Sequence, residues 1–306
     1  MRRITVGYRI GIRLKKDWQL HLLLLFPLAI LFIYHYLPMG GVLMAFQNYK
    51  PAKGIWGSDW VGWNNYRLLW SMQGFVYAVR NSFTIALAKI ILNVAVPVSF
   101  ALLLNEMGNV RMKKTVQTIV YMPHFISWVL MASIIIRLLS YNGVVNRALE
   151  ALGGERQIFL ADKALFQPII VLTDVWKEFG YGTIIYLAAM AGVDSDLYEA
   201  ALIDGAGYWK RMVHVTLPSI APTIVLMSTL ALGRILDAGF DQIFNLYTPA
   251  VYETADIIDK FVYRMAFTNM QYSMSTAAGL MKNCVSCVLI IVSYRLAYRL
   301  TGYRIF

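Results

Sequence analysis

Charged residues are scarce in this sequence: they make up 15% of its 306 residues, whereas soluble domains carry about 25%. Cysteine is scarcer still, because only two are present, and this excludes a disulfide-stapled scaffold. Hydrophobic residues account for 58% and aromatic residues for 14%, which excludes intrinsic disorder. The mean hydropathy is +0.55, more than a water-exposed globule tolerates. The composition therefore predicts an integral membrane protein.

Motifs for nucleotide chemistry and metal catalysis are also missing. No G-x-x-x-x-G-K-[ST] occurs, so the chain does not hold a nucleotide phosphate by that route. No H-E-x-x-H occurs, and the four histidines are scattered. Cys284 and Cys287 form a C-x-x-C inside an apolar run without a second pair, so we expect small core residues rather than zinc or redox ligands. We therefore expect no enzyme activity, no catalytic residue, no metal site and no cofactor bound by this chain.

Six apolar runs are long enough to cross a bilayer, which takes about 20 residues in a helix. They fall at residues 18–46, 76–104, 116–139, 166–192, 218–236 and 276–294. Prolines inside or near the ends of these runs are compatible with membrane helices, because neighbouring helices and Ser/Thr side chains satisfy the freed carbonyl groups. The predicted fold class is an all-α membrane protein with six transmembrane helices.

Lysine and arginine set the expected orientation, because cytoplasmic loops collect them. With the N-terminus inside, segments 1–17, 105–114, 193–217 and 295–306 hold 14 of these residues, against 8 on the longer outside segments. Both termini are therefore predicted to be cytoplasmic. The same bias explains the net charge of +11, so nucleic acid is not expected as a partner.

Residues 1–17 form a basic segment before the first apolar run. That run is too long for a signal peptide, and no small-x-small cleavage site follows it, so we expect a retained first span. The basic segment is expected to lie on anionic lipid headgroups. Residues 18–306 are expected to form one transmembrane domain.

The connection between the fourth and fifth apolar runs, residues 193–218, is the most informative part of the chain. Residues 194–196 (Asp-Ser-Asp) offer N-cap oxygens, and Asp196 is spaced to form a capping box with Glu199. A short helix is expected to follow.

This helix is expected to end at residues 205–207 (Gly-Ala-Gly), because glycine permits positive φ. A second short helix is expected next, with Trp209 and Met212 at helical spacing. Pro218 and Pro222 are then expected to redirect the chain into the fifth span.

The same connection resembles the EAA loop of ATP-binding-cassette (ABC) importer permeases. That signature is Glu-Ala-Ala, three residues, Gly, nine residues, then Ile-x-Leu-Pro. Here Glu199-Ala200-Ala201 is followed at this spacing by Gly205 and by Val215-Thr216-Leu217-Pro218, with Val in place of Ile. The resemblance implies membership of the binding-protein-dependent transport inner-membrane components, with their type I importer fold.

In that family a coupling helix, here about residues 197–207, docks on the ATPase subunit. The resemblance implies that Glu199 meets a basic residue of the ATPase and that Gly205 allows a sharp turn. The residues with an implied coupling role are Glu199, Ala200, Ala201, Asp204, Gly205, Gly207, Leu217 and Pro218.

The end of the first span carries a second resemblance. Residues 37–63 read LPMGGVLMAFQNYKPAKGIWGSDWVGW, which is similar to the oligosaccharide-uptake branch of these permeases, including alginate-type importers. The branch implies a multi-pass protein of the bacterial cytoplasmic (inner) membrane, an oligosaccharide substrate and an extracytoplasmic solute-binding protein. It also implies a heterodimer with a second, homologous permease and two copies of an ATPase, which hold ATP and Mg²⁺.

Charges inside the expected spans suggest where substrate passes, because such charges usually face a cavity or a partner. Two are acidic, Asp174 and Glu178, and the basic ones are Arg80, Lys89, Arg137, Lys177, Arg234 and Lys282. A positive cavity would suit an acidic sugar such as a uronate oligomer, with aromatic rings stacking on sugar faces. The alternatives are snorkelling to headgroups and an internal ion pair. The expected pathway residues are Asp174, Trp176, Lys177, Glu178 and Tyr181.

An ion-coupled secondary transporter or a channel is the alternative from a different class. Such proteins often contain inverted or parallel repeats, and the sequence shows no clear internal repeat. Co-purification discriminates between the classes, because an importer permease carries a nucleotide-hydrolysing subunit through detergent.

Overall fold

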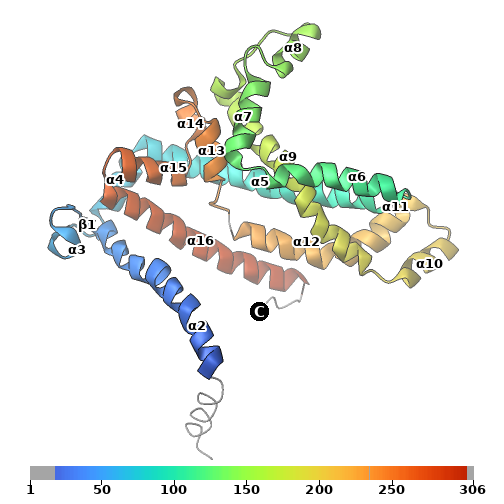
Figure 1. Ribbon diagram of the computed structural model, residues 1–306, viewed down its shortest axis with the longest axis horizontal. Coiled ribbons are helices and arrows are strands. Elements are labelled where there is room, and N and C mark those ends of the chain that lie inside the picture. Colours follow the sequence, from blue (N-terminus) through green and yellow to red (C-terminus); the bar gives the residue numbers. More distant parts are fainter. Residues whose placement is uncertain (1–17, 234, 302–306) are drawn as a thin grey trace, which may run out of the picture.

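The computed structural model describes residues 18–233 and 235–301; the expected basic segment 1–17 and Arg234 lie outside this part. Figure 1 shows an elongated body of helices with one short pair of strands. The long helices are α2 (Trp18–Leu31), α5 (Gln73–Asn105), α6 (Val110–Tyr121), α7 (Trp128–Leu139), α9 (Lys163–Ala191), α12 (Leu217–Leu232) and α16 (Tyr272–Thr301). The shorter ones are α3 (Gly54–Gly57), α4 (Asn64–Ser71), α8 (Val144–Ala151), α10 (Ser195–Ile203), α11 (Tyr208–Arg211), α13 (Phe240–Leu246), α14 (Tyr252–Ala255) and α15 (Ile258–Tyr263).

Several short 3₁₀ or π turns join or extend these helices. They are η1 (Phe32–Tyr36), η2 (Leu37–Phe46), η3 (Met122–Phe125), η4 (Phe159–Ala161), η5 (Met212–Thr216), η6 (Pro249–Val251) and η7 (Arg264–Thr268). The strands β1 (Gln47–Asn48) and β2 (Asp59–Trp60) pair antiparallel.

Helices α5 and α9 form the central pair of the body. They have 33 and 29 residues and pack along their lengths. Asp162 starts α9, because its side chain accepts hydrogen bonds from the backbone N–H groups of Ala164 and Leu165. The largest buried cluster surrounds this pair and includes Ile85, Met131, Ile135, Phe166, Ile170, Val175 and Ile243. This central pair therefore positions the polar residues described below.

Five helical stretches are long and apolar enough to cross a membrane: Trp18–Phe46, Gln73–Asn105, Trp128–Ala151, Tyr208–Leu232 and Tyr272–Arg295. The expected spans at 18–46, 76–104, 218–236 and 276–294 correspond to four of these. The expected span at 166–192 is the continuous helix α9, but its middle carries the charged residues Asp174, Lys177 and Glu178, and it is not among the five. The count of six spans therefore stays a prediction.

The expected span at 116–139 is wrong as a single helix. Helix α6 and the turn η3 lie along α9, and the chain then becomes extended at Ile126. Pro123 in η3 lacks an N–H group, and the Ser127 side chain caps a new helix by accepting from the Leu130 N–H. Figure 1 shows α7 and α8 leaving the body at an angle to α6.

Pro218 does not redirect the chain, contrary to expectation. Helices α11 and α12 are joined by η5 into one helical stretch. In η5 the Leu217 N–H bonds to the Met212 carbonyl five residues back. A widened turn of this kind avoids the clash between a proline ring and the carbonyl four residues earlier. The connection therefore contains one separate short helix, α10, rather than two.

The strand pair lies at the opposite end of the body from α10 (Figure 1). Asn65 of α4 is buried there and donates to the carbonyls of Ala45 and Gln47 at 2.9 and 3.0 Å. The Phe46 ring stacks on Trp60. These contacts tie the end of the first expected span to α4, whereas α2 itself has no buried residue.

Candidate functional site

Helix α10 begins at a side-chain cap. The Asp194 carboxylate accepts a hydrogen bond from the Asp196 N–H at 3.0 Å, so Asp194 satisfies a backbone donor that the first turn leaves free. Asp196 lies inside that first turn. The predicted capping box between Asp196 and Glu199 is therefore wrong, because the N-cap is Asp194, two residues before the position that the box requires.

Helix α10 ends in a Schellman motif, as the predicted glycine turn requires. The Gly205 N–H bonds to the Leu202 carbonyl at 3.0 Å, and the Ala206 N–H bonds to the Ala201 carbonyl at 2.9 Å. Gly205 has a φ of 74°, a left-handed conformation that glycine adopts at little cost. The prediction of a sharp turn at Gly205 is confirmed.

Helix α10 lies at one tip of the body (Figure 1), and its exposed surface combines large apolar side chains with acidic ones. The side chains of Leu197 and Ile203 are 50% and 88% exposed, and Glu199 and Ala200 are exposed between them. Tyr198 anchors the helix to η5, because its hydroxyl lies 3.0 Å from the Thr216 hydroxyl. The other residues of the expected coupling set range from half-buried to exposed: Ala201, Asp204, Gly205, Gly207, Leu217 and Pro218. Such a surface suits a partner protein.

The expected pathway residues divide between two faces of α9. Asp174, Lys177, Glu178 and Tyr181 are three or four residues apart and share one face. Trp176 is two residues from Asp174 and lies on the opposite face, since two residues advance a helix by about 200°. Both aromatic rings are partly exposed, Trp176 by 43% and Tyr181 by 44%. The structure therefore brings together four of the five.

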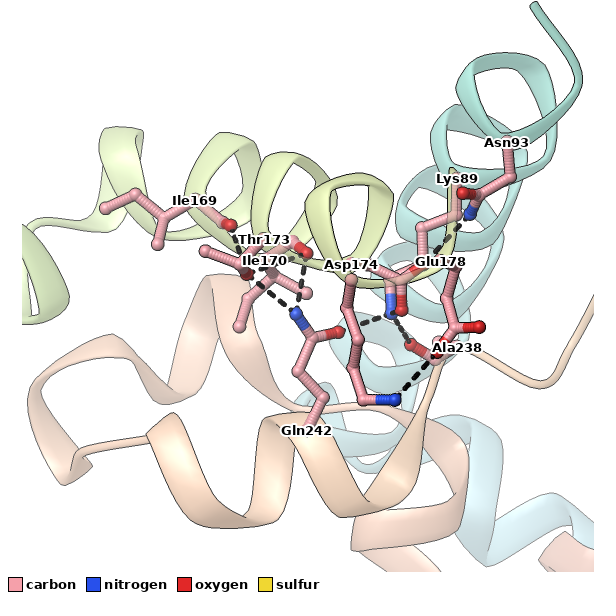
Figure 2. Close-up of polar contacts among 10 residues, drawn as sticks. Lys89, Asn93, Ile169, Ile170, Thr173, Asp174, Glu178, Ala238 and Gln242 are labelled. Atoms are coloured by element: carbon pink, nitrogen blue, oxygen red, sulfur yellow. Dashed lines mark hydrogen bonds and ion pairs between the residues drawn. The ribbon is translucent and has the colours of Figure 1, made fainter. Parts of the chain in front are cut away.

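Asp174 belongs to a buried network that joins three parts of the chain. One carboxylate oxygen accepts from the Lys89 ammonium at 2.8 Å and the other from the Asn93 amide at 2.9 Å. Lys89 also donates to the Gln242 side chain and to the Ala238 carbonyl. Figure 2 shows these groups converging between α5, α9 and α13.

Lys177 is an internal ion-pair partner. Its ammonium group donates to the His124 carbonyl at 2.7 Å and to Glu178 at 3.0 Å, and its side chain is 7% exposed, against 33% for Glu178. Lys282 is likewise paired, with Asp237 and Asp259. For these lysines the structure favours the internal ion pair that the sequence left as an alternative, because carboxylates lie within bonding distance and Lys177 is covered. The positive cavity stays a prediction.

Sequence reasoning missed His124, which completes this face of α9. Its ring stacks on Tyr181 with centroids 4.0 Å apart and planes 3° apart, and its Nδ1 lies 2.7 Å from a Glu178 carboxylate oxygen. The turn η3 places it there. A histidine beside a proline in an apolar run was the available signal, because polar groups in membrane helices usually have a partner or a function.

The part of the chain described by the structure offers no group of three or more His, Cys, Asp or Glu side chains placed to hold a metal ion. Cys284 and Cys287 are free and exposed on α16. Their prediction as small core residues is therefore wrong.

A helical body with five stretches able to cross a membrane defines the class as a multi-pass membrane protein. The chain belongs to the family of binding-protein-dependent transport system inner membrane components, whose sequence profile matches residues 60–301. This membership sets aside the alternative of an ion-coupled transporter or channel.

Two curated relatives are similar over most of the chain. Protein LplB of Bacillus subtilis (strain 168) is 42% identical over 278 residues, which cover 90% of this chain and 87% of the relative. The polygalacturonan/rhamnogalacturonan transport system permease protein YteP of the same strain is 38% identical over 290 residues, covering 94% and 90%.

Two solved structures contain similar chains. The first is a bacterial ABC transporter involved in the import of the acidic polysaccharide alginate; its chain has a TM-score of 0.90 and 36% identity, covering 96% of this chain and 99% of that chain. The second is a bacterial alginate ABC transporter in complex with an alginate pentasaccharide-bound periplasmic protein, with the same TM-score and identity and coverage of 97% and 100%. The protein is therefore a sugar-importer permease of an ABC transporter, a multi-pass component of the cytoplasmic membrane and not an enzyme.

Proposed function

We propose that this chain forms half of the translocation pathway of an ATP-driven importer of acidic oligosaccharides, and that α10 couples it to the ATPase. The observation that carries the proposal is α10 itself: an exposed helix with the Glu-Ala-Ala sequence, held in a fixed orientation by the Asp194 cap, the Gly205 turn and the bond between Tyr198 and Thr216. A rigid helix of this kind transmits movement of a docked subunit to α9 and α12, which flank it.

The assembly that we propose contains this permease, a second homologous permease, two ATPase subunits and an extracytoplasmic binding protein. The exposure of α2 is consistent with a second permease. None of its residues is buried by this chain, so its surface is available to contact lipid or a partner subunit. The proposed topology has α9 as the sixth crossing and both termini in the cytoplasm. ATP and Mg²⁺ belong to the ATPase subunits, and this chain binds no cofactor.

The acidic substrate is supported by the relatives, since one similar protein is a polygalacturonan/rhamnogalacturonan permease and another belongs to an alginate importer. We propose that substrate passes along the face of α9 that exposes Glu178 and Tyr181. Asp174 and Lys177 share this face but are bonded within the chain, and Trp176 lies on the opposite face. The half-exposed Tyr181 ring is fixed by His124 behind it, and a fixed aromatic face complements the apolar C–H face of a pyranose. Lys177 contributes by holding Glu178, and Asp174 by holding Lys89 and Asn93, rather than by touching a sugar.

The test of this function is purification of the tagged chain in mild detergent after co-expression with its proposed partners. We expect an ATPase to co-purify and its hydrolysis to rise when binding protein loaded with alginate pentasaccharide is added, with a smaller rise for maltopentaose as the neutral control. Absence of any ATPase would contradict the coupling role. Equal stimulation by both sugars would contradict only the preference for an acidic substrate and would leave the coupling role standing.

Replacing Tyr181 with alanine is expected to lower uptake of the acidic oligosaccharide about fivefold, because one stacking contact is worth about 1 kcal/mol. Tyr181→Phe keeps the ring and should retain uptake. Uptake of radiolabelled sugar into proteoliposomes is measured for both variants. If Trp176→Ala lowered uptake while Tyr181→Ala did not, the opposite face of α9 would line the pathway.

A further inference from the structure

The most completely bonded buried charge in the described part of the body is the ammonium group of Lys89, on α5. Its side chain is 8% exposed. It donates to Asp174 at 2.8 Å, to the Ala238 carbonyl at 2.9 Å and to the Gln242 side-chain oxygen at 2.5 Å. These three acceptors match the three N–H donors of an ammonium group. We refer to Lys89, Asp174, Ala238 and Gln242 as the Lys89 cluster (Figure 2).

The acceptors lie before and after α10 in the sequence. Asp174 lies in α9, which leads into α10, and it is about 26 Å along the helix from Ala191. Ala238 and Gln242 lie just beyond α12, which leads away from α10 and is about 24 Å long. The Lys89 cluster therefore joins the middle of α9 to the segment beyond the far end of α12, and these two helical arms hold α10 between them.

The segment after α12 is shaped around the ammonium group. Gly239 has a φ of 91°, and a Cβ at this position would lie 2.7 Å from the Lys89 nitrogen. The Gln242 amide also donates back to α9, to the Ile170 carbonyl at 2.7 Å and the Thr173 hydroxyl at 2.8 Å. The turn between α12 and α13 is thus fixed against α5 and α9 together.

We propose that Lys89 is a positioning residue for transport: its ammonium group joins α9 to the turn after α12, so that displacement of α10 moves α13–α15 at the other end of these arms. The proposal rests on the coupling role proposed for α10. Coupling between distant sites requires an element that both sites displace together, and the arms joined by Lys89 form such an element. Without the ammonium group, the Ala238 carbonyl loses its link to Asp174 and to α5, so that among the hydrogen bonds of the described residues only those of the Gln242 amide still join this segment to α9.

Stability alone does not account for a cluster of this kind. Replacing a buried ion pair with apolar residues of similar volume is often neutral or stabilising, whereas removing one partner leaves an uncompensated charge. A variant without both charges therefore separates a role in stability from a role in transport. Lys89→Met with Asp174→Leu removes the ion pair and the donors to Ala238 and Gln242 while filling the space.

The experiment uses the complete complex in proteoliposomes, with alginate pentasaccharide-loaded binding protein. For Lys89→Met/Asp174→Leu we expect assembly and unstimulated ATP hydrolysis close to wild type, but a fall of at least about tenfold in uptake per ATP hydrolysed. Lys163→Met is the matched control, because Lys163 makes an exposed ion pair with Glu253; its uptake should not change.

Wild-type uptake in the double variant, or a proportional fall in hydrolysis and uptake, would overturn the proposal. If the double variant does not assemble, uptake per ATP hydrolysed is measured in Gly239→Ala instead, because this substitution displaces the Lys89 nitrogen and keeps every charge. The same fall supports the proposal, and a wild-type ratio overturns it. Failure of the coupling role itself is distinguishable, because the wild-type chain would then carry no ATPase.

Discussion

Replacing Glu199 with lysine is expected to release the ATPase from the purified complex and to abolish sugar uptake. Glu199 is exposed in the middle of α10, and the EAA resemblance pairs it with a basic residue of the ATPase. Breaking a desolvated ion pair at an interface costs about 2–5 kcal/mol, which weakens docking by at least about 30-fold. Pull-down of the ATPase through a tag on this chain measures the docking, and uptake of labelled oligosaccharide measures its consequence.

The control is Glu155→Lys, which makes the same charge change at an exposed position of the connection between α8 and α9. Net charge is altered equally in the two variants, so a difference between them reports on α10. A Glu199→Lys complex that retained its ATPase and its uptake would refute docking through this helix.

Local features of the fold were predictable from sequence where one short stretch determines them. The α10 segment is an example, because its cap at Asp194 and its turn at Gly205 depend on residues within the segment. The break at Ile126 was not predicted, because hydropathy continues through it. Pro123 and Ser127 mark the break, yet membrane helices tolerate both residues, and only the packing of η3 on α9 selects a new helix there.

The candidate site was predictable in composition but not in pairing. The charges of α9 were identified, and their spacing already separates Trp176 from Asp174. Their partners were not identified: Lys89 is 85 residues from Asp174 and 153 from Gln242. Sequence therefore suggested a surplus of positive charge in the spans, while the folded chain pairs Lys89 and Lys282 with carboxylates that lie far away along the chain.

Gly180→Ala is expected to force α6 away from α9 and to lower the thermal stability of the protein. A Cβ at Gly180 would lie 2.7 Å from the Val120 carbonyl carbon and closer still to its oxygen. The atoms that the new Cβ would meet include the Val120 backbone, so α6 itself has to move, and a change of side-chain rotamer does not relieve the clash. Overpacking typically costs about 1–3 kcal/mol; we expect about 3 kcal/mol, which lowers Tm by on the order of 10 °C. Size-exclusion chromatography after heating in detergent measures this change.

Gly279→Ala is the matched control, because Gly279 lies in α16 and a Cβ added there would have nothing within 4 Å. Alanine is favoured over glycine in a helix by about 1 kcal/mol, so Tm should stay unchanged or rise. Displacing α6 also draws η3 and the His124 ring away from Tyr181, the residue after Gly180, so uptake should fall even at temperatures where the chain stays folded. Equal Tm values for the two variants would mean that α6 and α9 do not meet at Gly180.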